Sequence, residues 1–111
     1  MTPTEAATTL SLLLAAHFIC DYPLQGDFLA KAKNRHNPVP GVPWYQALGA
    51  HAVIHGAIAA VITGLPWVFI GEAIAHAMID DAKCAGRISF NKDQALHFLC
   101  KLAWFAAAWS A

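Results

Sequence analysis

Charged side chains are scarce in this chain: they make up 13% of its 111 residues, whereas 58% of the residues are hydrophobic. Soluble domains normally carry about 25% charged residues. So few charges leave too little polar surface to cover a water-facing domain of this size, whereas lipid is a suitable solvent for the apolar excess. The composition therefore predicts an integral membrane protein, and a soluble helical bundle with an apolar core is the alternative.

Several features that would indicate other protein classes are also missing. The formal net charge is zero and no basic run carries interleaved aromatic residues, so nothing in the sequence indicates nucleic-acid binding. Cys20, Cys84 and Cys100 form no C-x-x-C pair, and their odd number argues against a disulfide framework. Internal repeats and low-complexity segments are absent. We therefore expect a single domain, residues 1–111, with reduced thiols.

Apolar segments of helical length, separated by proline and glycine, fill most of the chain. The first begins with the capping pattern of Thr2, Pro3 and Glu5, and it should end near Asp21 because Pro23 follows. Each later segment is long enough for a helix that crosses most of a bilayer. Three further helices are expected, over residues 44–62, 66–84 and 91–110.

Two details complete this outline. Asn91 and Gln94 resemble a capping box and should open the last helix. Residues 24–35 are short and amphipathic, and we expect them to lie at the membrane interface. The predicted fold class is therefore all-α: a polytopic membrane four-helix bundle with a short interfacial helix between its first and second helices.

Basic residues gather at one end of the predicted bundle. Hairpin-connected helices alternate in direction, so the end of the first helix lies beside the start of the second and the turn between the third and fourth. Six of the seven basic residues fall at this end, which we call the basic end: Lys31, Lys33, Arg35, Lys83, Arg87 and Lys92. The positive-inside rule predicts that the basic end faces the cytoplasm, with both termini outside.

Ionisable residues recur at intervals of four in these helices, as in Glu72, His76 and Asp80. Such spacing puts side chains in one row on a helix, about 6 Å apart along its axis. Counted inward from the basic end, one histidine of each helix lies at a similar depth of roughly 7 to 12 Å, with aspartates above it. Seven residues make up this predicted polar layer: His17, Asp21, His51, His76, Asp80, Asp93 and His97.

The polar layer has the chemistry of a metal site. Imidazole nitrogen and carboxylate oxygen are ligands of zinc and of non-haem iron or manganese, and helical bundles assemble such sites from facing helices. We therefore predict one divalent metal, zinc first and iron or manganese next, or two metals bridged by a carboxylate. A structural or proton-relay network is the alternative. His55 and Glu72 are expected to lie deeper, outside the layer, and Lys101 to pair with an acid or to snorkel.

Four parts of the sequence carry a family resemblance: HFICDYPLQGDFLAKAK, the histidine at 51, HAMIDDAK and DQALH. In order and spacing they resemble the small bacterial and phage membrane proteins of domain-of-unknown-function family 3307. The resemblance covers nearly the whole chain and implies a location in the bacterial inner membrane. Two departures are Cys20, where the family usually has glycine, and Pro23, inside the Asp-x-x-Leu-Gln element. The family has no established activity, so the resemblance implies no reaction. It implies these characteristic polar positions: His17, Asp21, Gln25, Lys33, His51, His76, Asp80, Lys83, Asp93, Gln94 and His97.

Three functions are compatible with these observations. The leading hypothesis is a metal-dependent hydrolase that acts at the cytoplasmic leaflet on a lipid-like or phosphorylated substrate, and a looser similarity to membrane-bound metal-dependent hydrolases favours it by analogy. Asp80 or Asp93 would act as general base or bridging ligand, and Lys83 would neutralise substrate charge. The second hypothesis is a proton- or metal-ion relay, and the third a non-catalytic membrane interaction protein with a structural polar core. Membrane lipids are the expected partners, and association into a homo-oligomer stays open.

Overall fold

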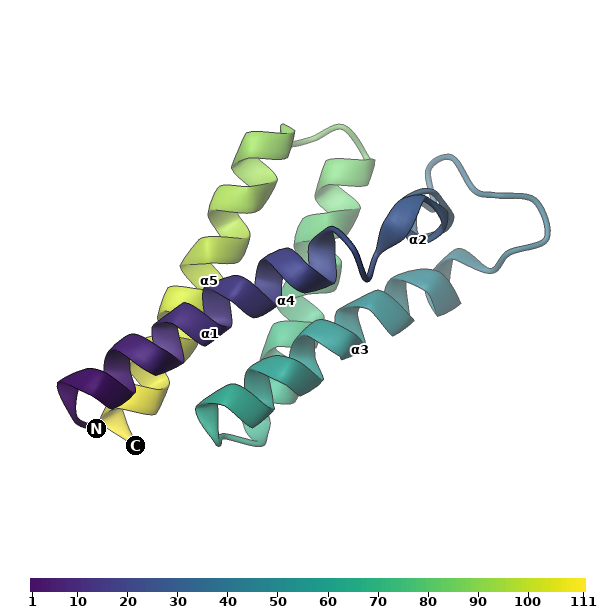
Figure 1. Cartoon of the computed structure of the whole chain (residues 1–111). Helices are drawn as coiled ribbons and strands as arrows, with labels where there is room; N and C mark the ends of the chain where they lie inside the picture. The colour runs from purple at the N-terminus through teal and green to yellow at the C-terminus, as the bar shows by residue number, and fades with distance from the viewer.

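The computed structural model describes all 111 residues and contains five α-helices and no strand. The prediction of an all-α fold is therefore confirmed. Both termini and the turn at residues 64–66 lie at one end, whereas the other connections lie at the basic end (Figure 1). The helices are α1 (Pro3–Asp21), α2 (Gly26–Ala32), α3 (Trp44–Thr63), α4 (Trp67–Cys84) and α5 (Phe90–Ser110).

Local sequence signals account for most helix ends. Thr2 and Glu5 form the predicted capping box of α1: the Thr2 hydroxyl accepts from the Glu5 N–H, and the Glu5 carboxylate accepts from the Thr2 N–H. Gly64, with φ +70°, ends α3 in the left-handed conformation that favours glycine.

The predicted start of α5 was wrong by one residue. Ser89 is the N-cap, and its hydroxyl accepts from the Lys92 N–H at 3.1 Å. Asn91 and Gln94 form no capping box, because the Gln94 side chain reaches into the bundle, where its amide contacts His17 and Asp21.

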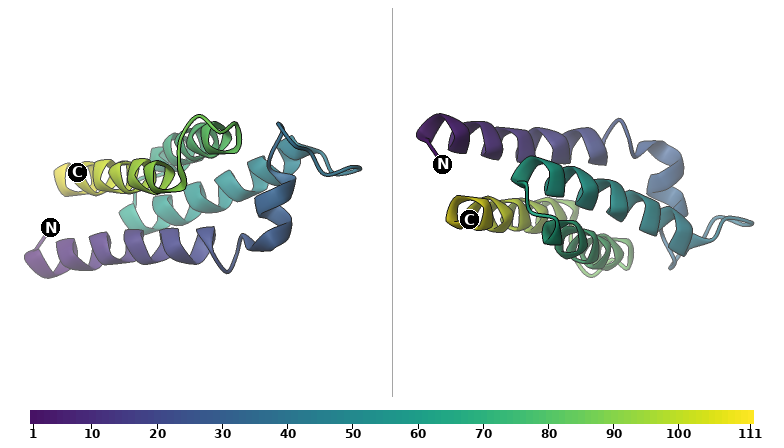
Figure 2. Two further views of the ribbon diagram at one scale, coloured as in Figure 1. Left: turned by 90° about the horizontal axis from the view of Figure 1, so that it is seen from above. Right: turned by 90° about the horizontal axis from the view of Figure 1, so that it is seen from below.

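The chain bends by 81° between α1 and α2, so α2 lies across the beginning of α3 rather than continuing α1 (Figure 2). Pro23 and Gly26, the latter with φ +63°, stand in the bend. The short helix predicted over residues 24–35 is thus α2, followed by a connector that covers residues 33–43. Lys33 is the C-cap residue of α2. Because of the bend, its side chain is buried.

The most extensive helix contact joins α3 and α4. Gly56 of α3 lies against the α4 backbone: a Cβ atom there would be 2.4 Å from the Phe69 carbonyl oxygen and 3.3 Å from Ala73 Cβ. This close approach needs a residue without a side chain, and it fixes the position of His51 on α3 relative to His76 on α4.

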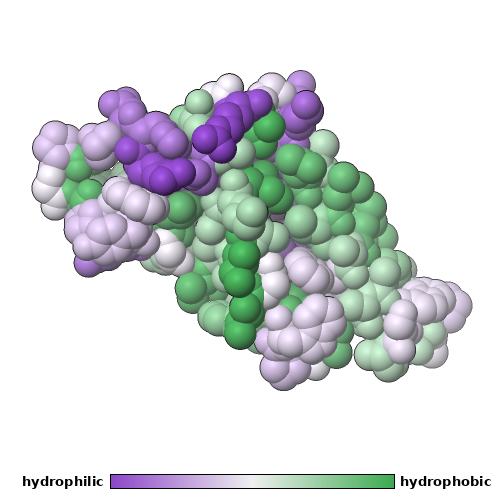
Figure 3. All heavy atoms as spheres, turned by 180° about the vertical axis from the view of Figure 1, so that it is seen from behind, coloured by the Kyte–Doolittle hydropathy of each residue, from purple (hydrophilic) through white to green (hydrophobic).

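The buried core is unusually polar. Of 21 buried residues, ten are polar or charged, and the apolar core cluster contains only Leu13, Ala59 and Val68. Large hydrophobic side chains lie outside, such as Val61 (82% exposed) and Met78 (68% exposed). Figure 3 shows hydrophobic residues over the middle of one face and hydrophilic residues gathered along its upper edge.

By length and composition, α3 is the one helix that could cross a membrane by itself. α1 and α2 pass the same test together, but only as a pair with the 81° bend between them. Core helices of soluble proteins also meet these criteria, so the predicted set of four membrane spans is not established by them.

Candidate metal centre

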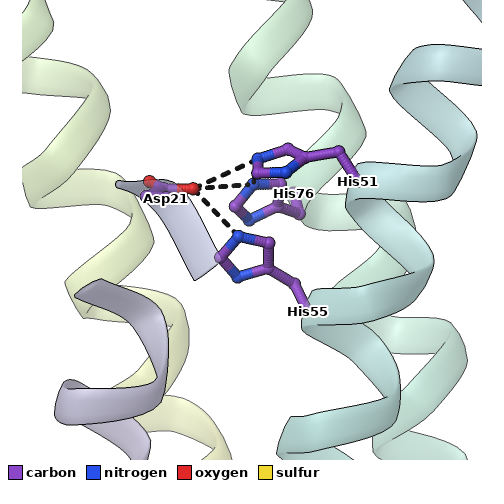
Figure 4. Close-up of side chains that lie close together, drawn as sticks. All are labelled: Asp21, His51, His55 and His76. Atoms are coloured by element: carbon purple, nitrogen blue, oxygen red, sulfur yellow. Dashed lines mark hydrogen bonds and ion pairs between the residues drawn. The ribbon is translucent and has the colours of Figure 1, made fainter. Parts of the chain in front are cut away.

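The polar layer assembles because antiparallel helices direct their side chains toward one another. Side chains lean toward the N-terminus of their own helix. Asp21 and His76 therefore lean away from the basic end, since α1 and α4 run toward it, whereas His51 and His97 lean toward the basic end. The carboxylate of Asp21, in the last turn of α1, meets imidazoles from α3 and α4 (Figure 4).

Five of the six distances among four donor atoms are close to those between ligand atoms of a tetrahedral metal ion. Nε2 of His51 lies 3.1 Å from Nε2 of His76, 3.2 Å from Oδ1 of Asp21 and 3.4 Å from Oδ2 of Asp80. Nε2 of His76 lies 3.5 Å from Oδ1 of Asp21 and 3.4 Å from Oδ2 of Asp80. Ligand atoms about 2.0 Å from a tetrahedral zinc ion are about 3.3 Å apart. We call these four atoms the central donor set.

No assignment of protons satisfies the central donor set by itself. Ionised carboxylate oxygens only accept hydrogen bonds, and an imidazole Nε2 either donates or accepts. If both Nε2 atoms carry a proton, their hydrogens meet across the 3.1 Å between His51 and His76. If one is unprotonated, it accepts the hydrogen of the other, and neither imidazole of the set then donates that hydrogen to a carboxylate. A cation at the centre removes this conflict, because all four lone pairs then point toward it.

His55 belongs to the same cluster, and the expectation that it lies deeper without a partner was wrong. Its Nε2 lies 2.9 Å from Oδ1 of Asp21 but lacks the angle of a hydrogen bond. Its ring also stacks on that of His76, with centroids 3.6 Å apart. His55 follows His51 by one helical turn and so starts deeper in the bundle. The Asp21 side chain leans away from the basic end and the His55 side chain leans toward it, so the two meet despite this difference in depth. Asp21, His51, His55 and His76 thus form one group that could hold a metal ion.

The remaining members of the polar layer surround the central donor set. Nε2 of His97 lies 3.0 Å from Oδ1 of Asp80 and 3.4 Å from Oδ1 of Asp93. His17 Nε2 lies 3.3 Å from Oδ2 of Asp21 and 3.0 Å from the Gln94 side-chain oxygen. All seven predicted residues therefore meet in one connected cluster.

In and below the layer, buried carboxylates outnumber buried ammonium groups by two. Lys33 donates to Asp80 at 2.6 Å, and Lys101 donates to Glu72. Two carboxylates then lack an ammonium partner, which equals the charge of one divalent cation. The groups are the carboxylates of Asp21, Glu72, Asp80 and Asp93 and the ammonium groups of Lys33 and Lys101.

A family model described as "Protein of unknown function (DUF3307)" matches residues 9–111. The chain belongs to this family. The matched range contains every residue of the polar layer, together with His55, Glu72 and Lys101. No curated protein and no solved structure matches the chain.

In this member of the family, a small polar pocket connects the layer with the basic end. The pocket has a volume of about 40 Å³, enough for one or a few water molecules, and Asp21, Asp80 and Asp93 line it. Lys83, predicted to neutralise substrate charge, also lines the pocket. Its side chain is exposed, with Nζ 5.9 Å from the centroid of the Phe90 ring. The basic group in contact with the layer is instead that of Lys33.

Three residues with a direct role in the cluster were not identified from their spacing. Its depth alone predicts that His55 lies outside the polar layer, and the spacing of Gln94 from Asn91 predicts a capping role. The amide nitrogen of Gln94 donates to Asp21 at 3.2 Å and to Asp93 at 3.0 Å. Glu72 lies with Oε1 3.4 Å from Nδ1 of His76, within ion-pair distance but without the geometry of a hydrogen bond. The four-residue spacing between Glu72 and His76 is the feature of the sequence that could have indicated this contact.

Proposed function

We propose that the protein is a membrane-embedded metal-dependent hydrolase. In this proposal it acts from the cytoplasmic leaflet of the bacterial inner membrane on a lipid-like or phosphorylated substrate. The observation that carries the proposal is the close approach of His51 and His76 to both Asp21 and Asp80, beside a polar pocket that the two aspartates line.

The distribution of polar and apolar residues favours a membrane location. Water-soluble domains bury apolar side chains and rarely bury Lys, Glu or Asp. This chain has the opposite arrangement, with Lys101 and Glu72 buried and large apolar residues such as Ile74 and Leu99 exposed. Lipid accommodates that outer surface, and the basic end then faces the cytoplasm by the positive-inside rule.

Hydrolysis is supported by the chemistry that the site offers. Asp21, Asp80, His51 and His76 would hold the metal, which would activate a water molecule near neutral pH through a further coordination position open to the pocket. Asp93, buried at the pocket, would serve as general base or as a further metal ligand. Lys83 at the pocket would attract a negatively charged substrate. Carboxylate and imidazole ligands suit zinc first, and iron or manganese next.

A relay function is less well supported. A relay needs ionisable groups that continue to the opposite end of the bundle. Below Glu72 and Lys101 lies the apolar cluster of Leu13, Ala59 and Val68, against which Ile62 and Leu65 also pack.

Metal content is the decisive measurement. Protein purified in mild detergent without chelator should contain at least one equivalent of zinc, iron or manganese by elemental mass spectrometry. His51→Ala and His76→Ala should lose most of it, since each removes a central donor, and His55→Ala should lose part. His36→Ala is the matched control: this histidine contacts Asp81 outside the layer and should leave the content unchanged.

If the wild-type protein is metal-free and its melting temperature does not change when zinc, iron or manganese is added, the polar layer is a structural network and this proposal is overturned. Where metal is present, hydrolysis of chromogenic phosphate and carboxylate esters is assayed with and without chelator. Activity that the chelator abolishes and Asp93→Asn reduces supports the enzyme. Metal without any hydrolysis would leave a metal-binding membrane protein.

The membrane location and its orientation have a separate test. A periplasmic phosphatase reporter fused after Ala111 should be active outside the cytoplasm, since both termini lie opposite the basic end (Figure 1). Activity only of a cytoplasmic reporter at that position would overturn the orientation.

A further inference from the structure

The two oxygens of Asp80 face different sets of nitrogen atoms. Oδ2 lies 3.4 Å from Nε2 of both His51 and His76, inside the central donor set. Oδ1 lies 3.0 Å from Nε2 of His97 on α5. The same His97 nitrogen lies 3.4 Å from Oδ1 of Asp93. Asp80 therefore stands between the central donor set and a second group of donors.

One atom of this second group is buried without a hydrogen-bond partner. Asp93 is 4% exposed, and its Oδ2 accepts from the Gln94 amide, but its Oδ1 accepts from no donor. His97 cannot serve both carboxylates, because its Nε2 has one proton to donate and Asp80 lies closer. A buried carboxylate oxygen without a donor is costly. The arrangement thus calls for a positive group between Asp80, Asp93 and His97.

We infer that Asp80 bridges two cations, and that a second divalent cation binds Oδ1 of Asp80, Oδ1 of Asp93 and Nε2 of His97. This inference rests on the proposed function, because the first cation occupies the central donor set. The rings of His76 and His97 stack with centroids 4.1 Å apart and 26° between their planes. Paired metal ions in hydrolytic sites are separated by about 3.5–4 Å, so parallel imidazoles at this spacing suit neighbouring ions.

The two sites differ in access and in charge. Both carboxylates of the second site, Asp80 and Asp93, line the pocket at the basic end, whereas the central set has two buried imidazoles, those of His51 and His76, and the second site has one, that of His97. The first cation neutralises the two unpaired carboxylates of the cluster. A second cation meets no remaining excess of negative charge, so it should bind more weakly than the first.

Manganese titration tests this order of binding. Wild-type protein, stripped with chelator and kept in detergent, should bind two equivalents of Mn²⁺ in two steps. The second step should produce the electron paramagnetic resonance spectrum of an exchange-coupled pair. Asp93→Asn keeps the size of the side chain and should bind one equivalent without coupling, as should His97→Ala. Asp27→Asn, which alters an exposed carboxylate of α2, is the control and should retain both steps.

Lys33→Met adds a test that removes no donor atom. It deletes the positive charge that lies 2.6 Å from Asp80, so the second step should tighten at least several-fold. A second step that is unchanged or weaker in Lys33→Met would contradict the charge argument.

The stoichiometry separates the two proposals. Binding of one equivalent in the wild type, without coupling, overturns the second site and leaves the central site intact. Binding of none overturns both. Two coupled equivalents in wild type and in Asp93→Asn alike would place the second ion elsewhere and overturn the assignment to Asp93.

Discussion

The bundle buries two groups of charges that differ in how they are neutralised. In the lower group, Glu72 accepts from Lys101 and from the Trp104 indole, so its charge is matched within the chain. In the polar layer, the carboxylates of Asp21, Asp80 and Asp93 have one ammonium partner among them, that of Lys33. A buried charge that the chain matches itself stabilises the fold, whereas one that the chain leaves unmatched indicates a ligand from outside.

The comparison predicts that the lower group makes the same contribution to the free energy of unfolding with and without bound metal. Lys101→Met leaves Glu72 charged and buried without its partner, which should lower the free energy of unfolding by about 3 to 5 kcal/mol. Thermal melting in detergent, with and without chelator, should show the same loss. The double variant Glu72→Leu/Lys101→Met is the control, and it should recover much of the stability because no unpaired charge remains. A loss confined to metal-loaded protein would assign Lys101 to the polar layer instead.

Asp21→Asn should behave in the opposite way. A bound cation stabilises the wild type by about 2.7 kcal/mol when its free concentration is a hundred times its Kd. The variant should lose this increment, because Asp21 supplies a central donor. In chelator it should be at least as stable as the wild type, since it carries one unmatched charge fewer. Equal destabilisation of Asp21→Asn in both conditions would remove the distinction between the two groups.

Gly56→Ala tests whether the spacing of α3 and α4 controls the polar layer. The new Cβ would collide with the Phe69 carbonyl oxygen and push the helices apart, costing about 1 to 3 kcal/mol. Metal affinity should fall as well, because His51 and His76 separate while every donor remains. Gly49→Ala on the same helix is the control: a Cβ there meets no atom within 4 Å, so stability should rise by up to about 1 kcal/mol. Metal affinity unchanged in Gly56→Ala would show that the layer tolerates a shift of α3.

The smallest effect is expected at the surface of the basic end. Arg35 donates two hydrogen bonds to Asp81, at 2.8 and 2.9 Å, and these bonds raise the pKa of its guanidinium. Arg35→Ala should lower the free energy of unfolding only slightly, in chelator and in metal alike, because the pair is partly exposed. Hydrogen exchange should become faster in the connector 33–43, and high salt should reduce the difference from wild type. A loss of metal in this variant would show that the connector controls the site.

The helices and the polar layer could be predicted because both follow from rigid local geometry. Proline and glycine mark the helix ends, and a fixed rise of about 1.5 Å per residue converts a position such as His76 into a depth. Alternating helices then bring His17, His51, His76 and His97 to one level. The contacts among these rings bear out that alignment.

The parts that could not be predicted depend on angles between elements. Nothing in the periodicity of residues 22–35 fixes the 81° bend that brings Lys33 to Asp80. The contact of His55 with Asp21 depends on side-chain lean, which a count of depths leaves out. Gln94 stands where a cap is expected, and only the packing of α5 against α1 shows that its amide is used elsewhere.

The spacing of the buried pairs along the sequence also has a consequence for biosynthesis. Asp80 is made 47 residues after Lys33, so its ammonium partner is already present when it leaves the ribosome. Glu72 is made 29 residues before Lys101 and lacks its ammonium partner until more than half of α5 has been made. Chains grow from the N-terminus, at about 5 to 20 residues per second, so an unfinished chain carries an uncompensated Glu72 for seconds. A truncation that removes α5 should therefore yield a chain recognised as misfolded rather than a smaller working bundle.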